Sequence, residues 1–401
     1  MNLLQFTHST PPAHVAFGRG THLQVAALLK RLEVSRPLCL WSDGSARAAS
    51  AVLEGLAAKS LGPVATSDRT RMHVPQALAV EHVQLARTSG ADSLVAVGGG
   101  SVIGLAKAVA LSTGLPIVSV PTTYSGSEMT DVWGMTHDGV KRTGRDRRVL
   151  PSAVAYDPGL TDELPRTVTG LSGLNAVAHA VEATYAEDTS PLVALIAEEA
   201  IHSMTRSLGG LAEEGTEADR DLALYASWLC GMSLSLTTMG LHHKLCHLLG
   251  GRFDAPHAAT HALVLPFVVR YLDPWLPPEQ RDILYTSVGG QDPAAVLTAL
   301  ARSFDAPTSL RDLCVDDSDV ASLTHELSTT LRPMAAPTDE DHLYALLRAL
   351  YLGELDALGP GDRPGQVPLS GTGCLASAPG RCYPAGPEKV PTISRRTNDE
   401  P

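Results

Sequence analysis

Residues 14–120 alternate short apolar runs with segments of helical periodicity, and this alternation is the strongest constraint on the fold. The apolar runs are too short for helices and lie at 14–18, 37–41, 92–97 and 115–120. Between them, apolar residues recur at helical spacing at 21–32, 46–58, 75–89 and 102–112. This order predicts an α/β domain with a doubly wound, Rossmann-like parallel sheet.

From about residue 165 the strand signals end, and helical segments follow one another between glycines and charged turns. This change predicts a second, all-α domain. After residue 358 the chain becomes dense in Pro, Gly, Ser and Thr and loses periodicity, which is typical of a disordered tail. We therefore expect a dinucleotide-binding domain at 1–162, a helical substrate domain at 163–357 and a disordered tail at 358–401.

The formal net charge of −12 argues against a nucleic-acid partner. The apolar run at 102–111 is interrupted by Lys107 and is too short to cross a membrane. The first residues contain no basic segment followed by an apolar core, so we expect a cytoplasmic protein. With an acidic chain, an anionic substrate has to be held by individually placed Arg, Lys or protonated His side chains.

A glycine turn follows the apolar run at 92–97 and opens the next helical segment. Such a turn lets the backbone approach a pyrophosphate, and the helix N-terminus supplies N–H donors, although a simple tight turn would have the same sequence. The turn consists of Gly98, Gly99, Gly100 and Ser101, and Thr122 and Thr123 follow the next predicted strand. Asp43, after the second run, is placed to bind an adenosine ribose and to repel a 2′-phosphate, or else to cap a helix. We therefore predict NADH as the cofactor, with NADPH possible.

Five histidines lie between residues 240 and 266, namely His242, His243, His247, His257 and His261. The pairs 243/247 and 257/261 are four residues apart, so each pair shares one helix face. We expect Gly250–Gly251 to end the first of these helices and Pro256 to open the second. Asn175 and His179 repeat the spacing on another predicted helix. A single histidine of this kind is usually structural, but this many in one hairpin predict a binding pocket.

The order Asn-x-x-x-His, His-x-x-x-His and then Pro-His resembles the iron-containing (group III) alcohol dehydrogenases. The resemblance covers about nine-tenths of the chain and implies a dehydroquinate synthase-like fold and a homodimer. In that family an Asp and three His bind a divalent metal, and the three His correspond to His179, His243 and His257. Asn175 stands where the family has the Asp. Because a neutral amide attracts a dication less than a carboxylate does, we expect no metal at these positions.

Other stretches resemble the maleylacetate reductase branch of this family: Tyr124, Met129–Thr130, Trp133, the TGRD sequence at 143–146, and His261. The resemblance implies NAD(P)H-dependent reduction of the carbon–carbon double bond of maleylacetate to 3-oxoadipate, in the breakdown of aromatic compounds. In that reaction charge develops on an enolate oxygen, which hydrogen-bond donors can stabilise without a metal.

These considerations assign a role to each candidate residue. We expect His243, His247 and His179 to be catalytic, with His247 as a candidate proton donor. The predicted substrate-binding residues are Asn175, His257, His261, Tyr124, Arg145 and Lys244. The predicted cofactor-binding residues are Asp43, Gly98, Gly99, Gly100, Ser101, Thr122 and Thr123. Arg145 and Lys244 are candidate clamps for the two substrate carboxylates, with a solvated loop charge as the alternative for Arg145.

Three other functions remain open on the sequence. The first is a metal-dependent alcohol or polyol dehydrogenase that uses Asn175 as an amide ligand. The second is a dehydroquinate synthase or glycerol-1-phosphate dehydrogenase, which would be expected to keep an acidic ligand. The third is a binding protein without activity, which failure to bind NADH would indicate.

Overall fold

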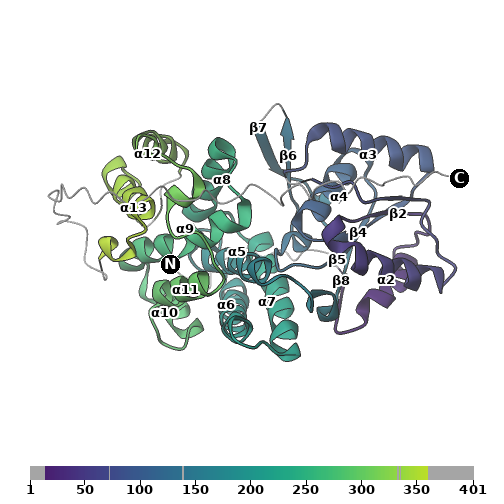
Figure 1. The fold of residues 1–401 in the computed structure, drawn as a ribbon, viewed down its shortest axis with the longest axis horizontal. Coiled ribbons are helices and arrows are strands. Elements are labelled where there is room, and N and C mark those ends of the chain that lie inside the picture. Colours follow the sequence, from purple (N-terminus) through teal and green to yellow (C-terminus); the bar gives the residue numbers. More distant parts are fainter. Residues whose placement is uncertain (1–13, 72, 138–139, 332–333, 335, 360–401) are drawn as a thin grey trace, which may run out of the picture.

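The computed structural model describes residues 14–359, apart from 72, 138–139, 332–333 and 335. It consists of an α/β half and a helical half side by side (Figure 1). The α/β half contains a six-stranded parallel sheet. Across the sheet the strands are β1 (His14–Phe17), β8 (Ala153–Tyr156), β5 (Ile117–Pro121), β4 (Ser93–Gly98), β2 (Pro37–Leu40) and β3 (Ala65–Ser67).

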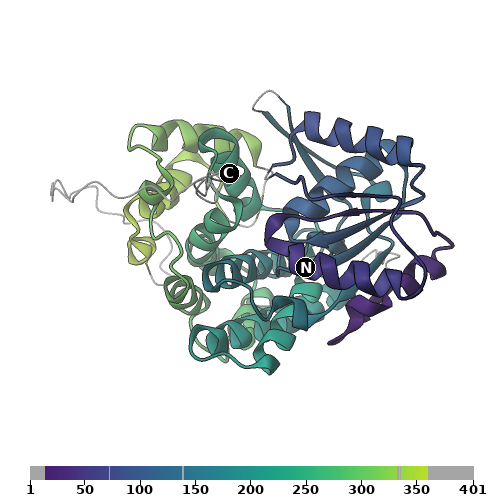
Figure 2. The same cartoon turned by 45° about the vertical axis from the view of Figure 1, so that its right-hand side comes forward.

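Helices cover both faces of this sheet, as the buried strands require. On β4, Leu94 and Ala96 belong to one apolar core, and Val95 and Val97 belong to another on the opposite face. The first core includes α3 (Gln76–Ser89) and α4 (Gly100–Thr113), and the second includes α1 (Val25–Arg31) and α2 (Ala46–Ala57). Figure 2 shows the sheet between these two groups of helices.

The direction of strand addition reverses at β2, which lies between β3 and β4. Open α/β sheets bind ligands at such a point, beyond the carboxyl ends of the strands. Here the Ser45 hydroxyl, in the turn after β2, donates to the carbonyl of Val97 at the end of β4, with an oxygen–oxygen distance of 2.9 Å. The turn that contains Asp43 therefore lies next to the glycine turn.

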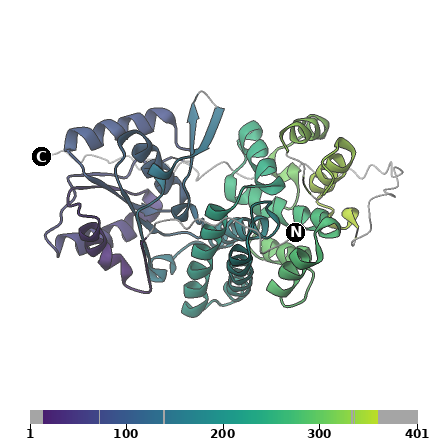
Figure 3. The same cartoon turned by 180° about the vertical axis from the view of Figure 1, so that it is seen from behind.

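An antiparallel hairpin of β6 (Val132–His137) and β7 (Val140–Arg145) projects from the α/β half beside α8 (Leu241–Phe253), as Figures 1 and 3 show. Its strands do not alternate between apolar and polar residues, so periodicity does not predict them. Arg145 ties the hairpin to the helical half, because its guanidinium donates to the carbonyls of Leu234 and Thr237.

The helical half is built around α5 (Arg166–Tyr185), whose residues from Thr169 to Thr184 are all buried. Local signals set several helix starts, such as the reciprocal Thr216–Asp219 capping box of α7 and the Ser190–Pro191 start of α6. The remaining helices are α6 (Pro191–Ala212), α7 (Glu217–Leu236), α8, α9 (His257–Leu272), α10 (Pro278–Ser287), α11 (Pro293–Ser303), α12 (Asp319–Thr330) and α13 (Glu340–Leu352).

One predicted helix end is wrong. The structure continues α8 through Gly250 and Gly251 to Phe253, and the left-handed residue that follows is Asp254, with a φ of 51°. Asp tolerates this conformation better than most residues other than Gly and Asn, so it can take the place of a C-terminal glycine.

The predicted fold class is confirmed by this arrangement. Strands give way to helices between β8 and α5, and the domain bounds at 1–162 and 163–357 stay a prediction. Almost all of the predicted tail, from residue 360 onward, lies outside the described residues. Over the described residues no single helix has the length and hydropathy to cross a membrane; α7 and α8 reach the threshold only as a pair bent by 95°.

Candidate active site

A cavity of about 440 Å³ lies between the two halves. The start of α4 contributes Gly100 and Ser101, and the loop after β5 contributes Thr123 and Ser125. Its other walls come from the hairpin and the helical half, with Trp133, Thr143, Asn175, His179, His243, His247 and His257 among the lining residues. The cavity thus brings the predicted cofactor turn and most of the predicted histidines together.

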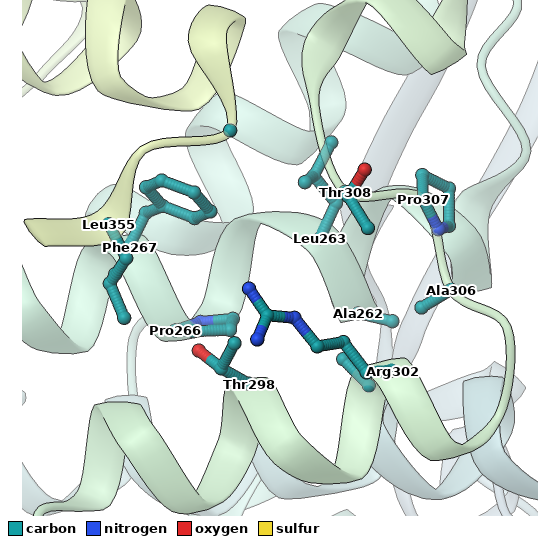
Figure 4. Close-up of a pocket in the computed structure, with 12 residues that line it drawn as sticks. Ala262, Leu263, Pro266, Phe267, Thr298, Arg302, Ala306, Pro307, Thr308 and Leu355 are labelled. Atoms are coloured by element: carbon teal, nitrogen blue, oxygen red, sulfur yellow. The ribbon is translucent and has the colours of Figure 1, made fainter.

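A second cavity, shown in Figure 4, is much smaller and measures only about 40 Å³. It lies between α9, α11 and the chain near Leu355, and Pro266 and Phe267 form part of its wall. None of the predicted site residues lines it. Space for little more than a few water molecules excludes it as a dicarboxylate site.

The glycine turn is shaped by close contacts. Gly98 has a φ of 155°, which favours glycine, and a Cβ there would lie 2.5 Å from the Val102 Cγ2. A Cβ on Gly99 would lie 2.8 Å from the Thr123 Oγ1. Gly100 then begins α4, so the free N–H groups of its first turn are available to an anionic ligand. This geometry fits a bound pyrophosphate.

The histidine rings form a connected group. The ring centroids of His179 and His243 are 5.1 Å apart, and those of His247 and His257 are 6.4 Å apart, both in stacked geometry. Burial lowers the pKa of His179 well below its ordinary value, so this imidazole is neutral at pH 7. His179 can therefore bind a substrate oxygen through a hydrogen bond but not through a positive charge.

Four lining residues carry buried polar atoms that have no hydrogen-bond partner among the described residues. These atoms are the Ser125 Oγ, the Asn175 Oδ1, the His179 Nδ1 and the His243 Nε2. Leaving such groups unsatisfied costs about 1–3 kcal/mol each. A polar ligand in the cavity can therefore gain binding energy by pairing with them.

His261 does not line the cavity. It is fully buried behind His257, and its Nδ1 lies 2.8 Å from the His242 Nε2. His242, His261 and Cys246 are the one group of three or more His, Cys, Asp or Glu residues, in the part of the chain that the structure describes, whose ligand atoms all lie within 4.8 Å of one another. Since two of these atoms already share a hydrogen bond, the cluster is explained without a metal.

Three further predicted substrate-binding residues also lie outside the cavity lining. Tyr124 is buried in the core, where its hydroxyl lies 3.3 Å from the Thr161 Oγ1. The Arg145 guanidinium is engaged by Asp131 and by carbonyls at the end of α7. The Lys244 Nζ donates to the Thr330 carbonyl, 2.8 Å away. Each side chain is held by partners distant in sequence, which spacing alone does not reveal.

Two predicted cofactor residues, Thr122 and Thr123, contact the glycine turn. Thr122 is buried and its N–H donates to the Gly98 carbonyl, while Thr123 lines the cavity. Asp43 is exposed at the first position of a 3₁₀ turn, Asp43–Ser45. That turn is capped by Ser42 and Ser45, so capping does not require the Asp43 carboxylate. Binding of a ribose by Asp43 stays a prediction.

Two further buried residues, Lys107 and Glu182, line the cavity or contact a residue that lines it. Lys107 lines the cavity, and its Nζ donates to the Ser127 and Val132 carbonyls, 2.7 and 2.9 Å away. Burial lowers the pKa of Lys107 to about 7 and raises that of its neighbour Glu128 to about 7. Through its hydrogen bonds to the Ser127 and Val132 carbonyls, Lys107 fixes the segment between β5 and the hairpin.

The other addition is Glu182, on α5. Burial by itself would raise the pKa of this carboxyl group, but the neighbouring His243 and its hydrogen bond lower it to about 2. Glu182 accepts from the His243 Nδ1 at 2.6 Å. Its position three residues after His179, on the same helix face, is the signal that could have identified it.

The resident iron that the family implies can be tested against these residues. In the described structure His179, His243 and His257 do not bring three ligand atoms within 4.8 Å of one another, and Asn175 brings no charge. The nearby carboxylate of Glu182 is already occupied. Without a free carboxylate this donor set attracts a dication less strongly than one with an acidic ligand, and the absence of a metal stays a prediction.

Comparison with known proteins agrees with this geometry. Residues 12–158 match the family "iron-containing alcohol dehydrogenase", and residues 169–351 match the C-terminal part of the Fe-containing alcohol dehydrogenase family. A maleylacetate reductase from Pseudomonas knackmussii is 43% identical over 352 residues, which cover 87% of this chain and 99% of that protein.

Solved structures that are similar to this chain include two maleylacetate reductases. The maleylacetate reductase from Rhizobium sp. strain MTP-10005 is 38% identical, with a TM-score of 0.82 over 88% of this chain and 99% of that one. The enzyme from Agrobacterium tumefaciens is 36% identical, also with a TM-score of 0.82, over 87% and 99% of the two chains. The chain belongs to the iron-containing alcohol dehydrogenase family.

Proposed function

We propose that this protein is an NADH-dependent enzyme that reduces the carbon–carbon double bond of maleylacetate to give 3-oxoadipate. The observation that carries the proposal is the cavity, which is lined by a glycine turn, by several histidines and by an amide, and which contains unsatisfied polar atoms. The 43% identity to a maleylacetate reductase over nearly its whole length supports the same substrate.

The α/β half would hold the cofactor. Gly99 leaves space beside Thr123 that any side chain would fill, and the first turn of α4 offers free N–H groups to the pyrophosphate. Bound NADH would supply a hydride to the alkene carbon that lies β to the ketone. The exposed carboxylate of Asp43 at the switch point favours NADH over NADPH.

The helical half would bind the substrate and manage charge and protons. As the double bond is reduced, negative charge moves to the ketone oxygen, and N–H groups of His179 and Asn175, which line the cavity, would stabilise it. The carbon next to the ketone then takes a proton, for which His243 and His247 line the cavity. Hydride and proton together convert the alkene to a saturated chain and leave the ketone intact.

We also propose that this reaction needs no metal, and that the enzyme is a homodimer. The family description names iron, so metal independence does not follow from family membership. It rests instead on the neutral Asn175 and on the engaged carboxylate of Glu182. A metal-dependent alcohol dehydrogenase of the same family is the second candidate, favoured by the family description alone.

An isotope experiment separates these two reactions. Maleylacetate and NADH deuterated at the transferred position are incubated with the enzyme, and the product is analysed by mass spectrometry and NMR. The proposal predicts 3-oxoadipate with deuterium on a methylene carbon and the ketone retained. Deuterium on a carbon that bears a new hydroxyl group would show that the carbonyl is reduced instead.

A further inference from the structure

Glu182 has an unusual set of partners for a carboxylate that is only 2% exposed. It accepts hydrogen bonds from the backbone N–H groups of Gly240, His242 and His243, at 3.0, 2.7 and 3.3 Å. It also contacts the His243 Nδ1 at 2.6 Å and the Tyr185 hydroxyl at 3.3 Å. One side chain of α5 thus caps the start of α8 and holds an imidazole of that same helix.

These contacts determine the state of the His243 ring. An ionised carboxylate can only accept hydrogen bonds, so Nδ1 has to carry a proton, and Nε2 is the ring nitrogen that can exchange a proton with a ligand. The other ring nitrogen, Nε2, has no partner among the described residues, and His243 lines the cavity. The carboxylate therefore sets both the tautomer and the direction of the ring.

We infer that Glu182 is a positioning residue for the reduction, which keeps the His243 Nε2 directed at the substrate. This inference rests on the proposed function, because it assumes that His243 contacts the substrate. A carboxylate that orients a catalytic imidazole through Nδ1 is a general device for fixing the reactive nitrogen. A purely structural cap would need the backbone N–H contacts but not the contact with Nδ1.

The test variant is Glu182→Gln, which keeps the shape but replaces one acceptor oxygen by an NH₂ donor. The amide cannot satisfy all the donors, so the His243 ring loses its acceptor or changes tautomer. We expect kcat for maleylacetate to fall about 10–100-fold, as for other residues that orient a catalytic group. The KM for NADH is expected to stay the same, because Glu182 does not line the cavity beside the glycine turn.

A matched control comes from the same connection between α7 and α8. Asp188 accepts from the Thr238 N–H and hydroxyl, at 2.9 and 2.6 Å, and touches no histidine in the described structure. Asp188→Asn should lower the unfolding temperature and leave kcat unchanged. Equal loss of kcat in Asp188→Asn and Glu182→Gln would show that loosening this connection is sufficient, and would overturn the inference.

A double-mutant cycle tests whether Glu182 acts through His243. In a His243→Ala background, Glu182→Gln should lower kcat no further, whereas independent effects would multiply. Multiplication of the two effects would contradict the inference.

NMR of the unmodified protein gives a readout that does not depend on turnover. With ¹⁵N-labelled histidine, the His243 Nδ1 should carry a slowly exchanging proton that is far downfield, and Glu182→Gln should remove this resonance. Its absence from the wild type would overturn the inference even if the variant does not fold. Failure of maleylacetate turnover with the resonance present would instead refute the proposed function.

Discussion

A substitution at the glycine turn tests the cofactor site most directly. Gly98→Ala introduces a Cβ at a φ of 155° and only 2.5 Å from the Val102 Cγ2. The backbone strain costs about 1–3 kcal/mol, and forcing Val102 aside costs about 1–3 kcal/mol more. We therefore expect the free energy of unfolding to fall by about 2–6 kcal/mol. Because Val102 lies in the first turn of α4, NADH affinity should fall as well.

Gly114→Ala is the matched control, at the other end of the same helix. Gly114 also has a positive φ, 71°, but a Cβ there would meet no atom within 4 Å. It should show the strain term alone, with unchanged NADH affinity. Unfolding in urea and NADH fluorescence titration measure both quantities. If Gly98→Ala is no less stable than Gly114→Ala and binds NADH normally, the close packing of this turn is refuted.

Two further predictions concern buried and engaged charges. The pKa of Glu128 is raised to about 7, so its own contribution to stability should fall as pH rises from about 4.5 to 7; the pKa of Lys107 is lowered to about 7, so its own contribution should rise from pH 7 to about 10.5. The difference in unfolding free energy between the wild type and Glu128→Gln should fall from about pH 4.5 to 7, and the difference between the wild type and Lys107→Met should rise from pH 7 to about 10.5; flat differences would contradict both assignments. Arg145→Ala should lower stability by about 1–3 kcal/mol through loss of its carbonyl contacts and leave the KM for maleylacetate unchanged. A tenfold or greater rise in that KM, estimated from loss of one charged contact, would restore Arg145 as a carboxylate clamp.

Local patterns predict the α/β half well because its elements are set by nearby residues. The strands β2, β4 and β5 are short apolar runs with every residue buried, and the glycine turn follows β4 directly. The hairpin and the short edge strand β3 carry no comparable pattern. Their positions depend on contacts such as those of Arg145 with α7, which sequence spacing does not encode.

In the candidate site, too, local spacing predicts the positions of some residues and not of others. Four-residue spacing correctly brings His243 and His247 to one wall of the cavity. The same spacing fails for His261, because one turn along α9 from His257 the helix is already inside the core. Glu182 is missed for a related reason, since its partners come from a segment about 60 residues later in the chain.

Metal-free reduction at a site with Asn175 in place of an acidic residue is the central claim, and one measurement tests it directly. The enzyme is purified in chelator, its metal content is measured by elemental analysis, and NADH oxidation is followed with maleylacetate. The account predicts full turnover with far less than one metal ion per chain, and no gain on addition of zinc or iron. Turnover that appears only when one of these metals is restored would contradict it and place the enzyme with the metal-dependent alcohol dehydrogenases.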